Sequence, residues 1–505
     1  MNINTVLRLG LVVCGLLGLS TRGQDFREQF EKRVSEFTLD NGLKFVVVVR
    51  HEAPVFSYTT YAAVGAVDET RGITGLAHFF EHMAFKGSTN IGTTNLAAEL
   101  AIFERQDAAF AEIKKLRRKG AGADKATLAA LEKRIQDLDR EAEQYIVKDE
   151  FDQIVQRAGG TSCNADTAWD RTRYYFSMPA NRLELWFALE SDRFLHPVLR
   201  EFYREREVVA EERRLGENDP IYRLREDLLA TMFKAHPYGQ PIIGHMSDIR
   251  SWTRQDAQTW FQTYYGASNL TIAIVGDVDP AQVQRLASVY FGRLPKLPKP
   301  DPVDTVEPEQ AGERRCSIVA QSQPMVCLAF HRPEFTHPDS AVFGTLTDIV
   351  SGGRTSRLYR SLVRDQKLAI TVGAQSLDDA TYGNAMGRYP NLFFFYSMPA
   401  PGHSNADNEQ ALLKEIEKLK TQPVTAEDLA KARNRARAAL IRQLNSNLGL
   451  AQQLVFYQAV AGDWRRLFVQ LERIDRVTAE DIQRIANQYL TFKNRTVGFV
   501  IPETL

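Results

Sequence analysis

The chain contains the segment WTRQDAQTWFQTYYGASNLTIAIVG at residues 252–276 and the related segment VTAEDIQRIANQYLTFKNRTVGFVI at residues 477–501. Aligned without a gap, at an offset of 225 positions, the two segments share seven identical residues and the same apolar pattern. Each predicts a helix that ends at a Tyr, then a turn at an Asn, then a buried strand. We therefore expect an internal duplication of two similar domains.

The rest of the chain mixes strand and helix patterns, which predicts an α+β fold of two homologous α/β-sandwich domains. Residues 294–312 (LPKLPKPDPVDTVEPEQAG) are rich in proline and charge, as expected of a linker. The first domain then covers residues 24–293, and the second covers residues 313–505.

A helical hairpin is expected within the first domain, at about residues 100–150. This stretch is rich in Ala, Glu, Lys, Arg and Leu and is broken by glycines at 120 and 122. Apolar residues recur with heptad spacing before and after the break. They are Ala109, Ile113 and Leu116, then Leu128, Leu131, Ile135 and Leu138. The charged residues would form a solvated face; the alternative is an arm that docks a partner.

The composition excludes several classes of protein. The chain has 63 basic and 63 acidic residues, so its net charge of zero gives no reason to expect a nucleic-acid partner. Arg8 precedes an apolar run at residues 9–19, and small residues follow; residues 1–23 therefore predict a signal peptide, cleaved near residues 20–24. That segment predicts export to the periplasm. No later stretch is long and apolar enough to span a membrane.

Three cysteines remain after the predicted signal peptide: Cys163, Cys316 and Cys327. We expect them to be buried as small apolar residues. The alternative is a disulfide between Cys316 and Cys327 across a hairpin.

The sharpest chemical signal is His78-Phe79-Phe80-Glu81-His82. Residues four apart lie on one face of a helix, so His78 and His82 can direct two imidazoles at one metal ion. Glu81 lies at the edge of that face, near a metal-bound water, in the H-x-x-E-H arrangement. The alternative interpretation is a pair of hydrogen-bonded histidines on a packed helix.

Two histidines leave one protein ligand missing from a catalytic zinc site. The segment EFYREREVVAEERR at residues 201–214 has a helical pattern and could supply a carboxylate. Spacing alone does not choose among four candidates, which are Glu205, Glu207, Glu211 and Glu212. The alternative is a solvated charged helix.

The second copy serves as an internal control. The offset, enlarged by about 53 residues for the hairpin, maps His78, Glu81 and His82 onto Ser356, Tyr359 and Arg360. Glu205 and Glu212, beyond the hairpin, map onto Ala430 and Arg437. The second domain is therefore expected to lack metal ligands.

Several stretches together resemble the pitrilysin/insulinase-type zinc metallopeptidases (inverzincins), and in particular the bacterial relatives of mitochondrial processing peptidase. The resemblance covers nearly the whole mature chain. The stretches are GLAHFFEHMAFKGS (75–88), NADTAWDRTRYYFSMP (164–179), EREVVAEE (205–212), HPYGQPIIGH (236–245), NLTIAIVGDVDP (269–280) and SGGRTSRLYRSL (351–362).

This resemblance implies roles for individual residues. It implies Glu212 as the third ligand of one zinc ion per chain, with Glu205 supporting the site from the second shell. It also implies that Asn164 and Ala165 lie on an edge strand that binds extended substrate. The spacing of 130 residues from His82 to Glu212 exceeds the family's usual spacing, and the hairpin accounts for the excess.

The resemblance is incomplete in the second domain. Active members usually carry an Arg and a Tyr that contact substrate near the scissile bond. Here Arg364 stands near the expected arginine, but Ile370 occupies the tyrosine's place. A homologous inactive partner chain could supply the missing contacts, which would make this chain the metal-bearing subunit of a heterodimer.

The predicted function is that of a zinc-dependent endopeptidase. Glu81 would act as general base on zinc-bound water, and peptides or unfolded segments would bind as an added β-strand. The alternative is a non-catalytic scaffold subunit on the same fold.

Overall fold

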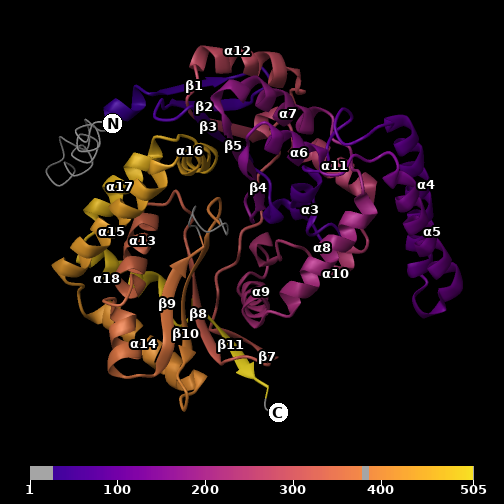
Figure 1. Cartoon of the computed structure of the whole chain (residues 1–505). Helices are drawn as coiled ribbons and strands as arrows, with labels where there is room; N and C mark the ends of the chain where they lie inside the picture. Colours follow the sequence, from indigo (N-terminus) through magenta and orange to yellow (C-terminus); the bar gives the residue numbers. More distant parts are fainter. Residues whose placement is uncertain (1–26, 378–385, 504–505) are drawn as a thin grey trace.

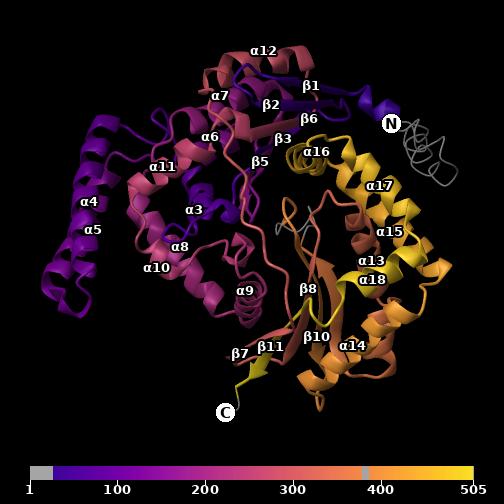
Figure 2. The ribbon, with the colours of Figure 1, turned by 180° about the vertical axis from the view of Figure 1, so that it is seen from behind.

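The computed structural model describes residues 27–377 and 386–503. Two sheets, each packed against helices, lie on either side of a central gap in the ribbon (Figures 1 and 2). The predicted signal peptide at residues 1–23 lies outside the described residues. Among the helices that are described, none combines the length and apolar character that crossing a bilayer requires.

The first sheet has six strands in the order β1-β2-β6-β3-β5-β4. Strands β2 and β6 are parallel, and every other neighbouring pair is antiparallel. In chain order the strands are β1 (Val34–Thr38), β2 (Lys44–Val49), β3 (Val55–Ala62), β4 (Thr161–Thr167), β5 (Thr172–Pro179) and β6 (Leu270–Gly276).

The second sheet has five strands in the order β7-β11-β8-β10-β9. Its one parallel pair is β7 with β11. From β2 onward, the first sheet therefore has the same order and the same strand directions as the second, which confirms the duplicated fold. The strands are β7 (Arg314–Ala320), β8 (Met325–Arg332), β9 (Ala369–Ser376), β10 (Asn391–Pro399) and β11 (Arg495–Pro502).

The two segments that match in sequence form the same substructure. Helices α11 (Arg254–Tyr264) and α18 (Ala479–Tyr489) both begin with a Thr–Asp capping box, which satisfies backbone N–H groups at the helix start. Beyond each helix, an Asn side chain donates to two backbone carbonyls. Asn269 donates to Ala63 and Tyr264, and Asn494 donates to His331 and Tyr489.

Helices cover one face of each sheet. Over the first sheet lie α3 (Leu76–Met83), α7 (Leu183–Leu195), α8 (Phe202–Glu217), α11 and α12 (Pro280–Tyr290), with the short α6 (Glu150–Arg157) and α10 (Met246–Ile249) beside them. The second sheet packs against α13 (Asp339–Ser351), α14 (Asn405–Thr421), α15 (Ala426–Asn445) and α18, and α17 (Arg466–Arg476) packs on α13.

The other face of each sheet is covered by a helix from the opposite half of the chain. Helix α9 (Pro220–Met232) packs Leu224 and Leu228 against β7 and β11 of the second sheet. Helix α16 (Asn447–Ala461) packs Leu450 and Leu454 against β3 and β6 of the first sheet. Figure 1 shows α16 against the upper sheet and α9 beside the lower one. The two halves are therefore interlocked.

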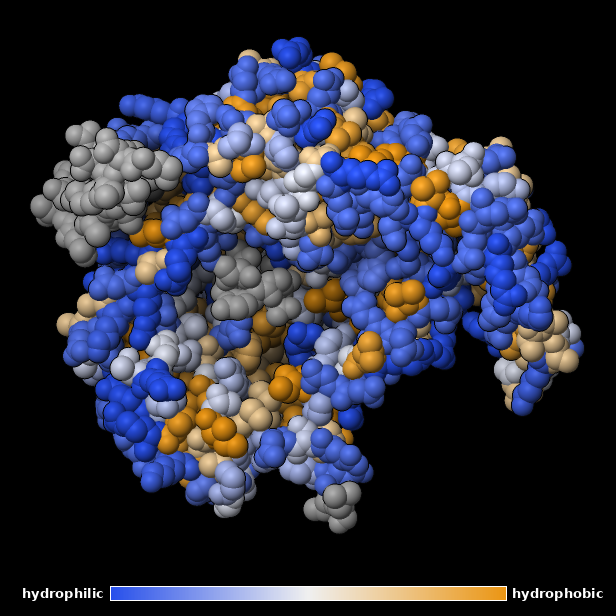
Figure 3. Space-filling view, viewed as in Figure 1, coloured by the Kyte–Doolittle hydropathy of each residue, from blue (hydrophilic) through white to orange (hydrophobic). Residues whose placement is uncertain are grey.

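The structure contains the helical hairpin as α4 (Leu96–Arg117) and α5 (Lys125–Glu143). Asp124 caps α5 by accepting the N–H groups of Ala126 and Thr127. Several apolar positions on the predicted heptad faces are buried, including Ala109, Ile113, Ile135 and Leu138. The outward surface of the hairpin is largely hydrophilic (Figure 3).

Between Arg293 and Arg314 the chain forms neither helix nor strand. This segment is anchored, because the Glu307 carboxylate accepts the backbone N–H groups of residues 234–236. The exact domain boundaries stay a prediction.

The three described cysteines are free thiols. Cys316 and Cys327 both lie opposite Gly498 of β11, which runs between their strands. Strands are about 4.8 Å apart, so the two residues are separated by roughly 10 Å, beyond the reach of a disulfide. The hairpin disulfide is therefore wrong, because a strand from the end of the chain enters between β7 and β8.

The strand register also corrects the mapping between the copies. Ala62 pairs with Leu270, and Phe330 pairs with Arg495, which is 225 positions after Leu270. Ala62 thus corresponds to Phe330, at an offset of 268, and α3 corresponds to part of α13 rather than to residues 356–360. At that offset His78, Glu81 and His82 correspond to three buried apolar residues, namely Leu346, Ile349 and Val350.

We expect neither half to fold alone. Residues 27–300 and 301–503, expressed separately, would each leave the apolar face of a sheet without its covering helix. Each half should be insoluble or bind a hydrophobic dye, and co-expression should recover a soluble complex. A soluble single half with a cooperative thermal transition would contradict this.

Candidate metal centre

Helix α3 carries two histidines on its polar side. It starts after Gly75, at φ 92°, and Glu69 accepts the N–H groups of Gly75 and Ala77 at 2.6 and 2.7 Å. The apolar side chains of α3 are buried in the first core and fix its rotation. His78 and His82 then lie one turn apart, with ring centroids separated by 4.7 Å.

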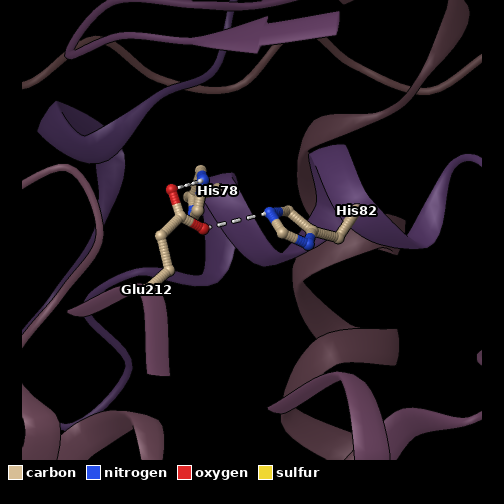
Figure 4. A group of neighbouring side chains, drawn as sticks. All are labelled: His78, His82 and Glu212. Atoms are coloured by element: carbon tan, nitrogen blue, oxygen red, sulfur yellow. Dashed lines mark ion pairs between the residues drawn. The ribbon is translucent and has the colours of Figure 1, made fainter. Parts of the chain in front are cut away.

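Helix α8 brings a carboxylate to both imidazoles. Glu212 places Oε1 3.7 Å from His78 Nε2 and Oε2 3.5 Å from His82 Nε2 (Figure 4). The three residues each offer a ligand atom within 4.8 Å of the others. Within residues 27–377 and 386–503, this is the only group of three or more such side chains at that spacing.

The other glutamates of α8 have different partners. The Glu205 carboxylate accepts from His82 Nδ1 at 2.8 Å and lies 2.8 Å from Lys86 Nζ. Glu207 pairs with Arg206 and Glu211 pairs with Arg214 on the exposed side of the helix. Of the four glutamates that spacing left open as the third ligand, only Glu212 therefore faces both histidines.

The contact with Glu205 determines which nitrogen of His82 faces Glu212. Because Nδ1 faces the Glu205 carboxylate, Nε2 is the ring nitrogen that faces Glu212. Burial works against the charged forms of His82 and Glu205, but their hydrogen bonds outweigh it. The pKa of His82 rises to about 9, and the pKa of Glu205 falls to about 2.

His78 has the opposite character. Burial, together with the neighbouring His82, lowers the pKa of His78 to about 4, so its imidazole is neutral near pH 7. The hydrogen bond with His82 is the main cause that lowers the pKa of Glu212. The site therefore offers a neutral imidazole and an ionised carboxylate.

The donor set fits zinc. Zinc takes imidazole nitrogens and carboxylate oxygens at about 2.0–2.2 Å in tetrahedral geometry, which places two ligands roughly 3.4 Å apart. The separations of 3.7 and 3.5 Å from Glu212 to His78 and His82 are close to this spacing.

Glu81 lies on the same short helix. Burial raises the pKa of its carboxyl, and the nearby His82 opposes that shift. A carboxyl group with a raised pKa can hold and release a proton nearer neutral pH than an exposed one.

Of the predicted substrate-binding residues, two lie on the strand that contacts α3. Asn164 and Ala165 lie on β4, the edge strand of the first sheet, which packs next to α3. Arg364 is exposed and pairs with its neighbour Asp365, so it is not brought into contact with the cluster. Ile370 is exposed on β9.

Sequence reasoning missed Lys86. Its ammonium lies 2.8 Å from Glu205 and 3.3 Å from Glu201, so it neutralises the carboxylate behind His82. The sequence did contain one indication of this role, because Lys86 lies four residues after His82.

A spacious cavity of about 740 Å³ lies elsewhere, among α13, α15, α16 and α17. None of the cluster residues lines it. The cluster instead opens to solvent, since the Glu212 side chain is 48% exposed.

Comparison with known proteins shows the family of the chain. The sequence pattern of the family described as "Insulinase (Peptidase family M16)" matches residues 46–114 and 142–245. The pattern described as "Peptidase M16 inactive domain" matches residues 251–436. The chain belongs to peptidase family M16. The M16 match skips residues 115–141, which form the tip of the hairpin and most of α5.

Individual M16 relatives cover nearly all of the chain. The zinc protease PqqE of Helicobacter pylori is 29% identical over 99% of both chains. A probable mitochondrial-processing peptidase subunit beta of Arabidopsis thaliana is 24% identical, over 94% of this chain and 78% of the relative. A crystal structure of a Helicobacter pylori protease superposes with a TM-score of 0.76 at 26% identity, over 93% of this chain and 99% of that one.

We expect Glu205→Gln to weaken zinc binding by about 10- to 100-fold, because the amide no longer holds His82 Nδ1 with a charged acceptor. Equilibrium dialysis with zinc measures the change. Glu207→Gln, on the exposed side of the same helix, is the matched control and should bind zinc like the wild type. Equal affinities for both variants would contradict the assignment.

Proposed function

We propose that this chain is a zinc-dependent endopeptidase. The observation that supports it is the convergence of His78, His82 and Glu212 within 4.8 Å, with Glu81 on the same helix. The relatives in family M16 that are named zinc proteases support the same reaction class.

In this proposal His78, His82 and Glu212 hold one zinc ion per chain. When bound, zinc supplies a Lewis acid for the scissile carbonyl and lowers the pKa of water to about 7. Glu205 and Lys86 keep the His82 ring in the orientation that this requires.

Glu81 moves the proton. Its carboxylate accepts a proton from the attacking water and then gives that proton to the amine nitrogen of the leaving peptide. The raised pKa of Glu81 favours both halves of this transfer, because the group that takes the proton must also release it.

Substrate would bind along β4. Among the described residues, the far edge of this strand has no partner in the sheet; Asn164 and Ala165 lie on the strand, which contacts α3. An extended peptide that adds to this edge forms backbone hydrogen bonds, which favours peptides and unfolded segments over folded proteins.

We also propose that the chain is exported to the periplasm, on the basis of the N-terminal segment, and that it works with a homologous partner. The resemblance to the family implies a substrate-contacting Tyr where Ile370 stands, and Arg364 is paired with Asp365. One relative is named as a subunit of a processing peptidase. The partner would supply the Arg and Tyr contacts.

The second candidate function is a scaffold without catalysis. It is favoured by the match of the second half to a pattern described as an inactive domain. The two functions differ in whether the metal cluster is used.

Glu81→Gln separates them. The variant should retain zinc, because Glu81 is not in the ligand cluster, and should lose peptide cleavage by about 10²- to 10⁴-fold. Zinc content and cleavage of an unfolded polypeptide are measured on the same preparation. His78→Ala, which removes a ligand, is the comparison and should lose both. Wild-type protein without zinc and without cleavage would support the scaffold.

We expect the purified chain to cleave slowly alone and faster with its partner. Adding a homologous chain that lacks the histidines but carries the Arg and Tyr should raise kcat, and light scattering should detect a complex. Full activity of the chain as a monomer would count against the heterodimer.

A further inference from the structure

The base of the α4–α5 hairpin meets the proposed zinc site through one buried guanidinium. Arg200 is 1% exposed and lies just before α8, the helix that carries Glu205 and Glu212. Its side chain reaches both α4 and the loop that follows α3.

Every N–H donor of Arg200 has an acceptor. Nε and Nη2 donate to the Glu99 carboxylate at 2.5 and 3.1 Å. Nη1 donates to the carbonyls of Lys86 and Ile91 at 2.6 and 3.2 Å, and Nη2 also donates to the carbonyl of Ser88 at 3.1 Å. A guanidinium has five donors in a fixed plane, so these contacts define its position fully.

The loop at residues 86–92 is shaped to admit this side chain. Gly87 and Gly92 have φ of 86° and 93°, in the left-handed region that favours glycine. A Cβ at either position would lie 3.0 or 2.7 Å from Arg200 Nη1. This loop starts four residues after His82 and three residues after the end of α3 at Met83.

Glu99 provides the charge that makes this arrangement possible. It lies in the first turn of α4, is fully buried, and pairs with Arg200. Removing one partner of a buried ion pair leaves an uncompensated charge, which is strongly unfavourable.

Further along α4, two contacts hold α8 against rotation. Tyr203 of α8 donates its hydroxyl to Asp107 at 2.8 Å, and the guanidinium of Arg206 lies 4.4 Å from the centre of the Phe110 ring. These residues flank Glu205 on the helix, so α4 contacts the side of α8 that faces away from the histidines.

We propose that Glu99 and Arg200 are positioning residues of the metal site. Together they hold the loop after α3 and the start of α8 in one fixed relation, so that Glu212 lies within ligand distance of His78 and His82. The base of the hairpin is thus part of the metal site, and its tip is not. This inference rests on the proposed zinc binding.

The geometry explains why the relation must be tight. Glu212 lies 3.7 and 3.5 Å from the two imidazole nitrogens, near the ligand spacing of tetrahedral zinc. A slip of about 1 Å between α3 and α8 would take one ligand out of range.

The test is the zinc affinity of the full-length protein, measured by competition with a chromogenic chelator. Glu99→Gln and Arg200→Lys should each bind zinc about tenfold more weakly or worse. Glu99→Asp, which keeps the charge, should recover part of the loss. Arg105→Gln breaks the exposed Arg105–Glu141 pair of the same hairpin and should bind like the wild type. Replacing the tip residues 115–127 by a short glycine-rich turn should also leave affinity unchanged.

A second readout separates positioning from general stability. The difference in Tm between zinc-loaded and zinc-free protein should shrink in Glu99→Gln and stay unchanged in Arg105→Gln. Wild-type affinity in both Glu99→Gln and Arg200→Lys would overturn the inference. Failure of both variants to fold would overturn it as well, because the pair would then determine the fold rather than the site. Absence of zinc binding in the wild type would instead refute the proposed function.

Discussion

The proposed metal site is shared between two helices, so it depends on how accurately those helices are held together. Helix α3 has only eight residues and supplies His78 and His82, while Glu212 comes from α8, 130 residues later in the chain. Neither helix can form the site alone. The decisive contact between them is the hydrogen bond from His82 to Glu205, reinforced by Lys86, because it fixes both a ring orientation and the register of the two helices.

Charge is distributed around the site in alternating layers. The ligand cluster is backed by Glu205, Glu205 is neutralised by Lys86, and the backbone carbonyl of Lys86 is bound by Arg200. Arg200 in turn is neutralised by Glu99. Buried charges are tolerated only when they are paired and hydrogen-bonded, so each layer requires the next. Residues as far from the cluster as Glu99 are therefore connected to it through a chain of contacts.

The sequence allowed prediction of the parts that depend on local periodicity. The spacing of four residues predicted that His78 and His82 share a face, and the repeat at an offset of 225 predicted two related sheets. Four glutamates of α8 could not be separated, because periodicity gives the faces of a helix but not the face that meets α3. Arg200 was missed because it binds backbone carbonyls, which leave no mark in a sequence, and the carboxylate of Glu99, 101 residues away in the chain. The Cys316–Cys327 alternative failed for a similar reason, since it assumed that strands adjacent in sequence pair, whereas β11 runs between them.

The exchange of α9 and α16 between the halves bears on how such a protein can evolve. The second half has no counterpart of His78, His82 or Glu212 at the matching positions, yet it cannot be discarded, since its helix α16 covers the apolar face of the first sheet. Gene fission at the linker would leave two aggregation-prone fragments. Specialisation is therefore expected to proceed by duplicating the entire gene, after which one paralogue keeps the chemistry and the other is free to diverge.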